Sequence, residues 1–387
     1  MRRKIYLTAA AGLSLALSLA ACSGGGAGST GETTGGASGA AEGGTVGVSM
    51  PTQTSERWIA DGNAVKKGLE AQGFTVDLQF ANDDIPTQSQ QIDQMITQGV
   101  DSLIIAAIDG TALSSQLQAA KDAGITVVSY DRLIRDTENI NYYVTFDNYQ
   151  VGVQQATSLL VGLGIVDRDG KELGATGPFN VELFAGSLDD NNAHLFWQGA
   201  IDTLQPYFDD GTLVVPSGQM DINQTNILRW LQETAQARME NLLTASYSDG
   251  TPLAGVLSPY DGISRGIITA LQNSPSIPGD TIETGLPVVT GQDAEIASVK
   301  LIVDGVQFAS IFKDTRKLAE QAVVVTKAFL EGNAPEANDT TTYDNGVKVV
   351  PSFLLTSDIV YASTVQSLLV DSGYWTAEEV ASGVAAG

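Results

Sequence analysis

The sequence predicts an α/β fold of two lobes, each a doubly wound parallel sheet. Short runs of branched aliphatic residues alternate with helical patterns along most of the 387 residues. The strands read as continuous apolar runs, which is typical of parallel sheets covered by helices on both faces. About 340 residues follow the N-terminal region, more than one core usually holds. We therefore expect two domains.

The predicted strands follow one another at regular intervals. In the first lobe they are 45–50, 75–80, 102–107 and 126–130, and apolar residues at helical spacing, such as Ile92, Met95 and Ile96, separate them. The same alternation of strand and helix patterns recurs in the second lobe, where the predicted strands are 179–185, 253–258 and 286–291.

The N-terminus has the three regions of an export signal. Basic residues at positions 2–4 precede an apolar stretch, 5–18, which is shorter than the roughly 20 residues needed to cross a bilayer. The run Leu19-Ala20-Ala21-Cys22 resembles the lipobox of bacterial lipoproteins. This resemblance implies that residues 1–21 are a signal peptide and that the Cys22 thiol is lipidated. The alternative is an ordinary secretory signal that contains a cysteine.

Residues 22–44 are expected to form a flexible linker behind this anchor. From residue 23 to residue 44 the chain has ten glycines and neither aromatic nor branched aliphatic residues. Such a segment buries too little apolar surface to offset the entropy of ordering. As a coil it spans about 25 Å. We expect a lipid-anchored, extracytoplasmic protein on the outer face of the cell membrane or in the periplasm.

The composition argues against several classes of function. The formal net charge is −25, and removal of residues 1–21 with their three basic groups makes it −28. A surface this acidic repels phosphate backbones, so we expect no nucleic-acid partner. His194 is the single histidine and Cys22 the single cysteine. This argues against a histidine- or cysteine-based metal site and a Ser-His-Asp triad, and we expect no cofactor.

Polar and aromatic residues gather just after the predicted strands. Ligands of open parallel sheets bind beyond the carboxyl ends of the strands, so these residues are the candidates for a binding site. They are Arg57, Trp58, Asp131, Arg132, Asn191, Asn192, Arg229, Trp230, Asp261, Asp293 and Lys313.

The charges of this set indicate a neutral, polyhydroxylated ligand. Four cations face three carboxylates, whereas an anionic ligand would favour a clear cationic excess. Each sugar hydroxyl can donate to an aspartate and accept from an arginine, a lysine or an asparagine. The apolar C–H face of a pyranose can stack on Trp58 or Trp230. The chemistry therefore points to a sugar.

Many ordered segments from about residue 45 onward carry a family resemblance. They are MPTQTSERWIADG, YDRLIR, TFDNYQVG, ELFAGSLDDNNA, SPYDG, GQDAE, IFKDTR and NGVKVVPSFLL. The chain resembles the multiple-monosaccharide (xylose/glucose/galactose-type) binding lipoproteins of bacterial ABC importers. The resemblance implies a type I periplasmic-binding fold, with two lobes joined by a three-crossover hinge and an aldopyranose enclosed between them.

The resemblance also implies roles and boundaries. The eleven candidates would bind the sugar, and the protein, acting as a monomer without enzymatic activity, would deliver it to an ABC transporter permease. Lobe one would comprise 45–146 and 313–345, and lobe two 147–312 and 346–387. His194-Leu195-Phe196-Trp197 stands where relatives often carry phenylalanines, so the stacking ring there is either missing or supplied by Phe196 or Trp197.

Other polar residues have simpler explanations. Asp84 and Asp109 each precede a helical pattern and are expected to be N-caps. The segment 167–170 is expected to form a turn rather than a calcium loop, and His194 to lie on a helix face.

Three alternatives remain open at the level of sequence. A surface glycosidase using two carboxylates would have a groove open to oligosaccharides. A sensory protein that presents sugar to a receptor would have the same fold and site. A binder of cyclitols or furanose-like signal molecules would differ only in its ligand.

Overall fold

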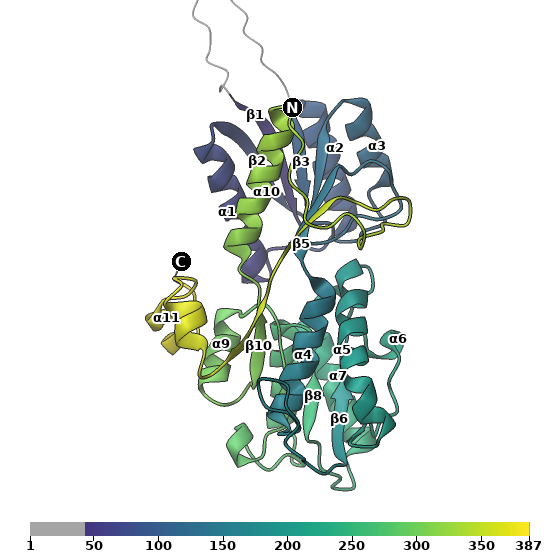
Figure 1. The fold of residues 1–387 in the computed structure, drawn as a ribbon, viewed down its shortest axis with the longest axis vertical. Helices are drawn as coiled ribbons and strands as arrows, with labels where there is room; N and C mark the ends of the chain where they lie inside the picture. The colour runs from purple at the N-terminus through teal and green to yellow at the C-terminus, as the bar shows by residue number, and fades with distance from the viewer. Residues whose placement is uncertain (1–42, 387) are drawn as a thin grey trace, which may run out of the picture. The chain divides into compact units, whose positions relative to one another are not determined.

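The computed structural model describes residues 43–386, which form one compact unit. The predictions for the signal peptide, for Cys22 and for the linker up to residue 42 lie outside the described residues. Figure 1 shows two sheets, each with helices packed around it. The parallel α/β architecture predicted from the sequence is confirmed.

The first lobe is built on a six-stranded parallel sheet with the order β11-β5-β4-β3-β1-β2. Its elements are β1 (Gly43–Met50), α1 (Glu56–Ala71), β2 (Phe74–Phe80), α2 (Ile85–Gln98), β3 (Ser102–Ile105), α3 (Ser114–Asp122), β4 (Thr126–Tyr130), β5 (Tyr142–Phe146), α10 (Thr315–Leu330) and β11 (Ser352–Leu355). The four predicted strands are present, and β1 starts two residues before the predicted start. The sequence analysis did not predict β5 and β11, which the structure adds to this sheet.

The second lobe holds a four-stranded parallel sheet, β7-β6-β8-β9, and an antiparallel pair, β10-β12. Its elements are α4 (Asn148–Gly162), β6 (Phe179–Leu183), α5 (Asn191–Asp209), β7 (Leu213–Val214), α6 (Ile222–Thr225), η1 (Leu228–Trp230), α7 (Gln232–Ser246), β8 (Gly255–Leu257), α8 (Asp261–Gln272), η2 (Ile282–Thr284), β9 (Val288–Val289), α9 (Ile296–Val303), β10 (Ala309–Phe312), β12 (Asp358–Tyr361), η3 (Gln366–Val370) and α11 (Ala377–Ser382).

The chain passes between the lobes three times, after β5, after β10 and after β11. The last crossing corrects the predicted boundary at residue 345. Residues 352–355 pair in parallel with β5, and Tyr343 and Val350 pack into the core of the first lobe. The first lobe therefore extends to Leu355.

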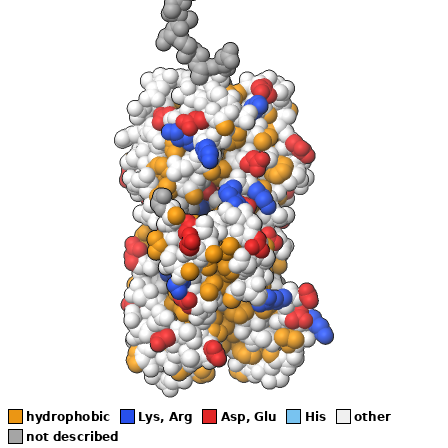
Figure 2. Space-filling model, turned by 90° about the vertical axis from the view of Figure 1, so that its left-hand side faces the viewer, with side chains coloured by type: hydrophobic (Ala, Val, Ile, Leu, Met, Phe, Trp, Pro, Cys, Tyr) orange, Lys and Arg blue, Asp and Glu red, His pale blue; other side chains and the backbone are white. Residues whose placement is uncertain are grey.

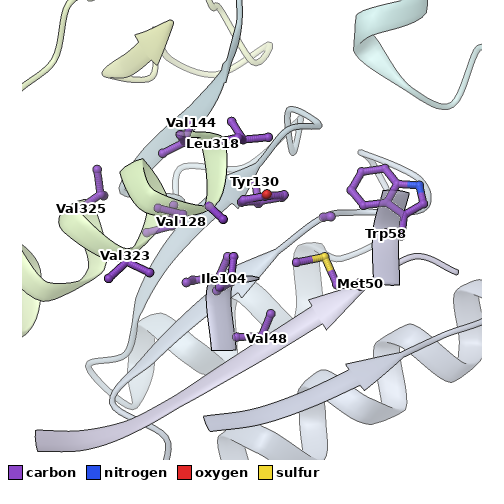
Figure 3. Close-up of a cluster of buried hydrophobic side chains, with 14 of the residues drawn as sticks. Val48, Met50, Trp58, Ile104, Val128, Tyr130, Val144, Leu318, Val323 and Val325 are labelled. Atoms are coloured by element: carbon purple, nitrogen blue, oxygen red, sulfur yellow. The ribbon is translucent and has the colours of Figure 1, made fainter. Parts of the chain in front are cut away.

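Opposite faces of the first sheet pack against different helices. Successive side chains of a strand point to opposite faces. In β3, Ile104 joins the cluster formed with α1 and α10, whereas Leu103 and Ile105 join the cluster formed with α2 and α3. Figure 3 shows Trp58 and Met50 at one end of the first of these clusters. The core thereby fixes Trp58, which follows β1 at the carboxyl end of the sheet.

The surface carries both signs of charge. On the face shown in Figure 2, acidic and basic side chains are interspersed, and hydrophobic side chains gather over the lower part. Within residues 43–386, every helix is too short or too polar to cross a membrane.

Two glycines allow α4 and α5 to pack with their backbones in contact. A Cβ added at Gly199 would lie 2.1 Å from the carbonyl oxygen of Tyr149, and one added at Gly152 would lie 2.1 Å from that of Phe196. Both obstacles are backbone atoms, which cannot swing aside. This contact fixes the start of α5, where Asn192 and Phe196 lie.

We expect Gly199→Ala to lower the free energy of unfolding by about 1–3 kcal/mol, because overpacking forces the two helices apart. The matched control is Gly68→Ala in α1. Its added Cβ would meet a side-chain methyl group of Val323 at 2.9 Å rather than a backbone atom, and alanine favours helix by up to about 1 kcal/mol over glycine. Denaturant titration of both variants checks this. Equal stability of Gly199→Ala and the unmodified protein would contradict it.

Candidate functional site

A cavity of about 410 Å³ lies at the carboxyl ends of the strands and is lined by both lobes. Nine of the eleven predicted residues line it, namely Arg57, Trp58, Asp131, Arg132, Asn192, Arg229, Trp230, Asp293 and Lys313. Asn191 and Asp261 are not among the lining residues. Segments far apart in the sequence thus meet here, as the strand-end rule anticipates.

Arg57 forms the centre of a buried ion-pair network. Its guanidinium bonds to Asp131, and its Nε and Nη1 atoms lie 3.4 Å from Asp61 Oδ2 and 3.5 Å from Asp293 Oδ1. Lys313 Nζ lies 3.0 Å from the same Asp293 oxygen. Asp293 belongs to the second lobe and Arg57, Asp61 and Asp131 to the first. The network therefore joins the lobes.

The carboxyls of this network differ in their affinity for protons. Burial opposes ionisation of Asp131, but Arg57 and Lys313 outweigh it and lower the pKa of Asp131. Asp61 lies behind Arg57, outside the cavity lining, and burial raises its pKa to about 7 against the opposing effect of Arg57. Two cations and three carboxylates leave one negative charge in excess, which a proton on Asp61 removes.

Several lining residues adopt left-handed backbone conformations. The φ angles are 58° at Asp131, 56° at Arg229, 59° at Trp230 and 90° at Asp293. Such angles cost of order 1–3 kcal/mol each in residues other than glycine and persist only where the surroundings enforce them. At each position the turn bends the chain sharply after a strand or within a short loop.

The turn at Asp131 is held by three hydrogen bonds to its carbonyl oxygen. The donors are Tyr143 Oη at 2.6 Å, Thr145 Oγ1 at 2.9 Å and Asn192 Nδ2 at 2.9 Å. The amide oxygen of Asn192 accepts from Asn148 Nδ2 at 3.0 Å, and it also lies 3.0 Å from Tyr143 Oη. Asn192 thus uses its side chain to hold Asp131 from across the lobes.

Two other arginines of the cavity lining also form ion pairs. Arg132 Nε lies 3.1 Å from Asp190 Oδ2, and Arg229 bonds to Asp189. Asp190 also caps α5 by accepting from the backbone N–H of Asn192. Burial raises the pKa of Asp190, and Arg132 opposes this increase.

The aromatic residues divide into a support and a wall. Trp58 is 5% exposed, and the guanidinium groups of Arg57 and Arg132 lie 4.6 and 5.1 Å from its ring. It therefore positions two arginines. The wall consists of Phe196, Trp230 and Tyr260. Their rings meet edge to face, with centroid separations of 6.4 Å between Phe196 and Trp230 and 6.1 Å between Trp230 and Tyr260. Of the two rings considered after the asparagines, Phe196 lines the cavity and Trp197 does not.

Asp261 serves as a support rather than a lining residue. Its carboxylate accepts from Gln307 Nε2 at 2.8 Å, from Ser310 Oγ at 2.9 Å and from the backbone N–H of Glu295 at 2.9 Å. These bonds hold the loop that carries Asp293. Burial, together with the nearby charge of Glu295, raises the pKa of Asp261 to about 8. Asn191 is the first residue of α5, and its neighbour Asn192 alone of the pair reaches the cavity.

Sequence reasoning missed several lining residues, among them Asp190, Tyr260 and Gln292. All three follow predicted strands, so the strand-end rule contains the signal. The rule does not tell which of two neighbours faces the cavity, and it led to Asp261 where Tyr260 lines the site. Asp84 is an N-cap as predicted, whereas Asp109 accepts from Thr111 in a turn before α3.

One buried donor at the cavity has no hydrogen-bond partner among the described residues. It is Trp230 Nε1. Buried polar groups are normally satisfied. A free donor on the cavity wall suits a ligand that offers an acceptor, as a hydroxyl does.

The chain is similar to known sugar-binding proteins. A family described as "periplasmic binding protein domain" matches residues 46–334. The multiple sugar-binding periplasmic receptor ChvE of Rhizobium radiobacter is 50% identical over 383 residues, 98% of this chain and all of the relative. The multiple sugar-binding periplasmic protein SbpA of Azospirillum brasilense is 53% identical over 336 residues, 86% of this chain and 90% of the relative.

The fold of this chain is also similar to that of a solved sugar-binding protein. An ABC transporter solute-binding protein of Clostridium phytofermentans with bound β-D-glucose superposes with a TM-score of 0.81 at 43% identity, covering 87% of this chain and 99% of that one.

The buried carboxyls predict a pH dependence of stability. An unfolded aspartate titrates near pH ~3.9, whereas folded Asp61 and Asp261 have pKa values of about 7 and about 8. Their contribution to stability is complete below the unfolded pKa and is lost as the pH rises through the folded values. The free energy of unfolding should therefore fall from pH 5.5 to pH 8, by at most about 1.4 kcal/mol per pH unit for each group.

Denaturant titration across this pH range checks the effect. Asp261→Asn should reduce the slope, since the substituted side chain no longer titrates, and the exposed Asp280→Asn should leave it unchanged. An unchanged slope in Asp261→Asn would refute the assignment of this proton to Asp261.

Proposed function

The chain belongs to the periplasmic binding protein family, and from this membership we propose that it is an extracytoplasmic solute-binding protein of an ABC importer. It captures a monosaccharide between its lobes and delivers it to the permease. Relatives of about 50% identity that are named as multiple sugar-binding proteins support this function.

The observation that carries the proposal is a cavity between two lobes ringed by paired charges. Arg57 and Asp131 come from the first lobe and Asp293 from the second, and all are buried. A sugar hydroxyl donates to a carboxylate and accepts from a guanidinium or ammonium group, and charge-assisted bonds of this kind are strong. Because the charges already balance one another, a neutral ligand adds no net charge to a buried site.

An aldopyranose such as glucose, xylose or galactose suits the remaining walls. The rings of Phe196 and Trp230 offer apolar surface for the C–H face of the sugar, and the indole N–H of Trp230 is free to donate. The similar protein from Clostridium phytofermentans holds β-D-glucose.

Capture occurs by hinge closure about the three crossovers. Sugar binds one lobe, and closure then adds the contacts of the other lobe and expels water. Since ligand and permease both favour the closed form, binding and recognition share one population shift. Bonds in the sugar stay intact.

The proposal includes no enzymatic activity. A glycosidase uses one carboxyl with a raised pKa to protonate the leaving group and a second carboxyl as nucleophile or base. Burial raises the pKa of the lining carboxyls Asp83 and Asp190, but Asp190 is paired with Arg132, and Asp131 and Asp293 are both paired with Arg57. The relatives of about 50% identity are named as sugar-binding proteins, which supports binding without hydrolysis.

The proposal places the protein outside the cytoplasm on a lipid anchor. The basic residues at positions 2–4, the apolar stretch after them and the lone Cys22 support this placement. The glycine-rich linker would let a monomeric body reach a permease while staying tethered.

Isothermal titration with D-glucose, D-xylose, D-galactose, L-arabinose and myo-inositol tests the function. We expect at least one aldopyranose to bind with a micromolar or lower Kd. Asp293→Asn should raise this Kd about 10- to 100-fold, because charged hydrogen bonds contribute about 1.5–3 kcal/mol.

Asp304→Asn is the matched control, since Asp304 pairs with Lys300 on the surface away from the cavity. Its affinity should equal that of the unmodified protein. If no monosaccharide binds, the proposed ligand class is wrong. If Asp293→Asn binds as tightly as Asp304→Asn, the site is wrongly placed.

A further inference from the structure

Hydrogen bonds outside the Arg57 network also join the lobes, among them the bond from the Gly110 N–H to the carbonyl oxygen of Asp189 at 3.1 Å and the bond between Ser55 and Glu295. Ser55 Oγ, between β1 and α1 of the first lobe, donates to Glu295 Oε1, after β9 of the second, over 2.8 Å. The two residues stand 240 positions apart in the chain.

Both residues are helix N-caps that do not cap their own helices. Ser55 precedes α1 and Glu295 precedes α9, and neither side chain bonds to the backbone of its helix. A serine at this position normally accepts from its own helix, which stabilises the fold by about 1 kcal/mol. The two side chains bond to each other instead.

The carboxylate of Glu295 is held in place from the second lobe. Tyr260 Oη donates to Glu295 Oε1 over 2.8 Å, and Arg265 Nη2 donates to Oε2 over 2.7 Å. The backbone N–H of Glu295 donates to Asp261 Oδ2. The carboxylate is therefore preorganised in the second lobe, and Ser55 is its single described partner from the first.

The hydrogen bond between Ser55 and Glu295 lies beside the cavity. Ser55, Tyr260 and Arg265 line the cavity, whereas Glu295 does not. We propose that Ser55 and Glu295 form an interlobe clasp that sets the affinity for the sugar by holding the lobes closed rather than by binding the ligand.

This inference rests on the proposed function, because the clasp matters only if the lobes open and close around a ligand. The two atoms separate when the lobes open, so the bond stabilises the closed form alone. Its loss should speed release of every sugar by the same factor. A side chain that binds the sugar would instead discriminate between ligands.

Ser55→Ala is a clean probe of the clasp. After this substitution Glu295 keeps Tyr260 and Arg265 as partners, and α1 loses no cap bond because Ser55 makes none. Ser55→Thr retains a hydroxyl and should recover most of the effect. The control is Thr376→Ala, which removes a true cap from α11, where Thr376 accepts from the backbone N–H of Glu379.

Stopped-flow measurement of tryptophan fluorescence follows binding of D-glucose and D-xylose, since Trp58 and Trp230 line the cavity. For Ser55→Ala we expect koff and Kd to rise about tenfold for both sugars with kon unchanged, equivalent to about 1.4 kcal/mol. Thr376→Ala should bind as the unmodified protein does. A Kd within twofold of the unmodified value, or a loss confined to one sugar, overturns the clasp.

A second measurement separates the clasp from the proposed function. Spin labels on cysteines at Glu70 and Gln205, both exposed and in different lobes, report the closed fraction without ligand in a Cys22→Ser background. Ser55→Ala should lower this fraction. If the unmodified protein binds no monosaccharide, the proposed function fails, and an unchanged closed fraction in Ser55→Ala is then what overturns the clasp.

Discussion

The pairing of Arg57 with three carboxylates is the constraint on which the binding region depends. Arg57 holds Asp61 and Asp131 of its own lobe and meets Asp293 of the other. Isolated charges at this depth would be strongly destabilising, so each is tolerated only while its partners stay in place. The position of the lobes and the ionisation of the site are therefore coupled. Because the positive and negative charges of this network offset one another, the site suits a ligand without net charge.

The surrounding chain is arranged to keep these charges in place. Left-handed turns at Asp131 and Asp293 aim the two carboxylates into the cavity, and hydrogen bonds from both lobes secure the first of them. The local strain is offset by the packed sheets from which the turns emerge. A site that is ordered before the ligand arrives loses less entropy on binding.

Carboxyls at the cavity and behind it have different tasks. Asp131, Asp190 and Asp293 line the cavity and are paired with cations. Asp61, Asp261 and Glu295 lie outside the lining and hold other groups, and burial shifts the first two toward the protonated form at neutral pH. An acidic residue after a strand can therefore bind a ligand or support the loop that does, and only its neighbours decide.

The fold class and most of the lining of the candidate cavity can be predicted from the amino-acid sequence. Apolar runs between helical patterns indicate covered parallel strands, and the carboxyl ends of such strands meet at one edge whatever their order, so nine of eleven candidates line one cavity. Three features become visible only in the folded chain: β11 completes the first sheet, Tyr260 rather than Asp261 lines the cavity, and Ser55 bonds to Glu295. Periodicity reports the burial of a segment, because burial follows from local spacing. The other features depend on where segments distant in the sequence lie in the folded protein. They are the pairing of a short edge strand, the direction of one side chain at a turn and a contact between residues 240 positions apart.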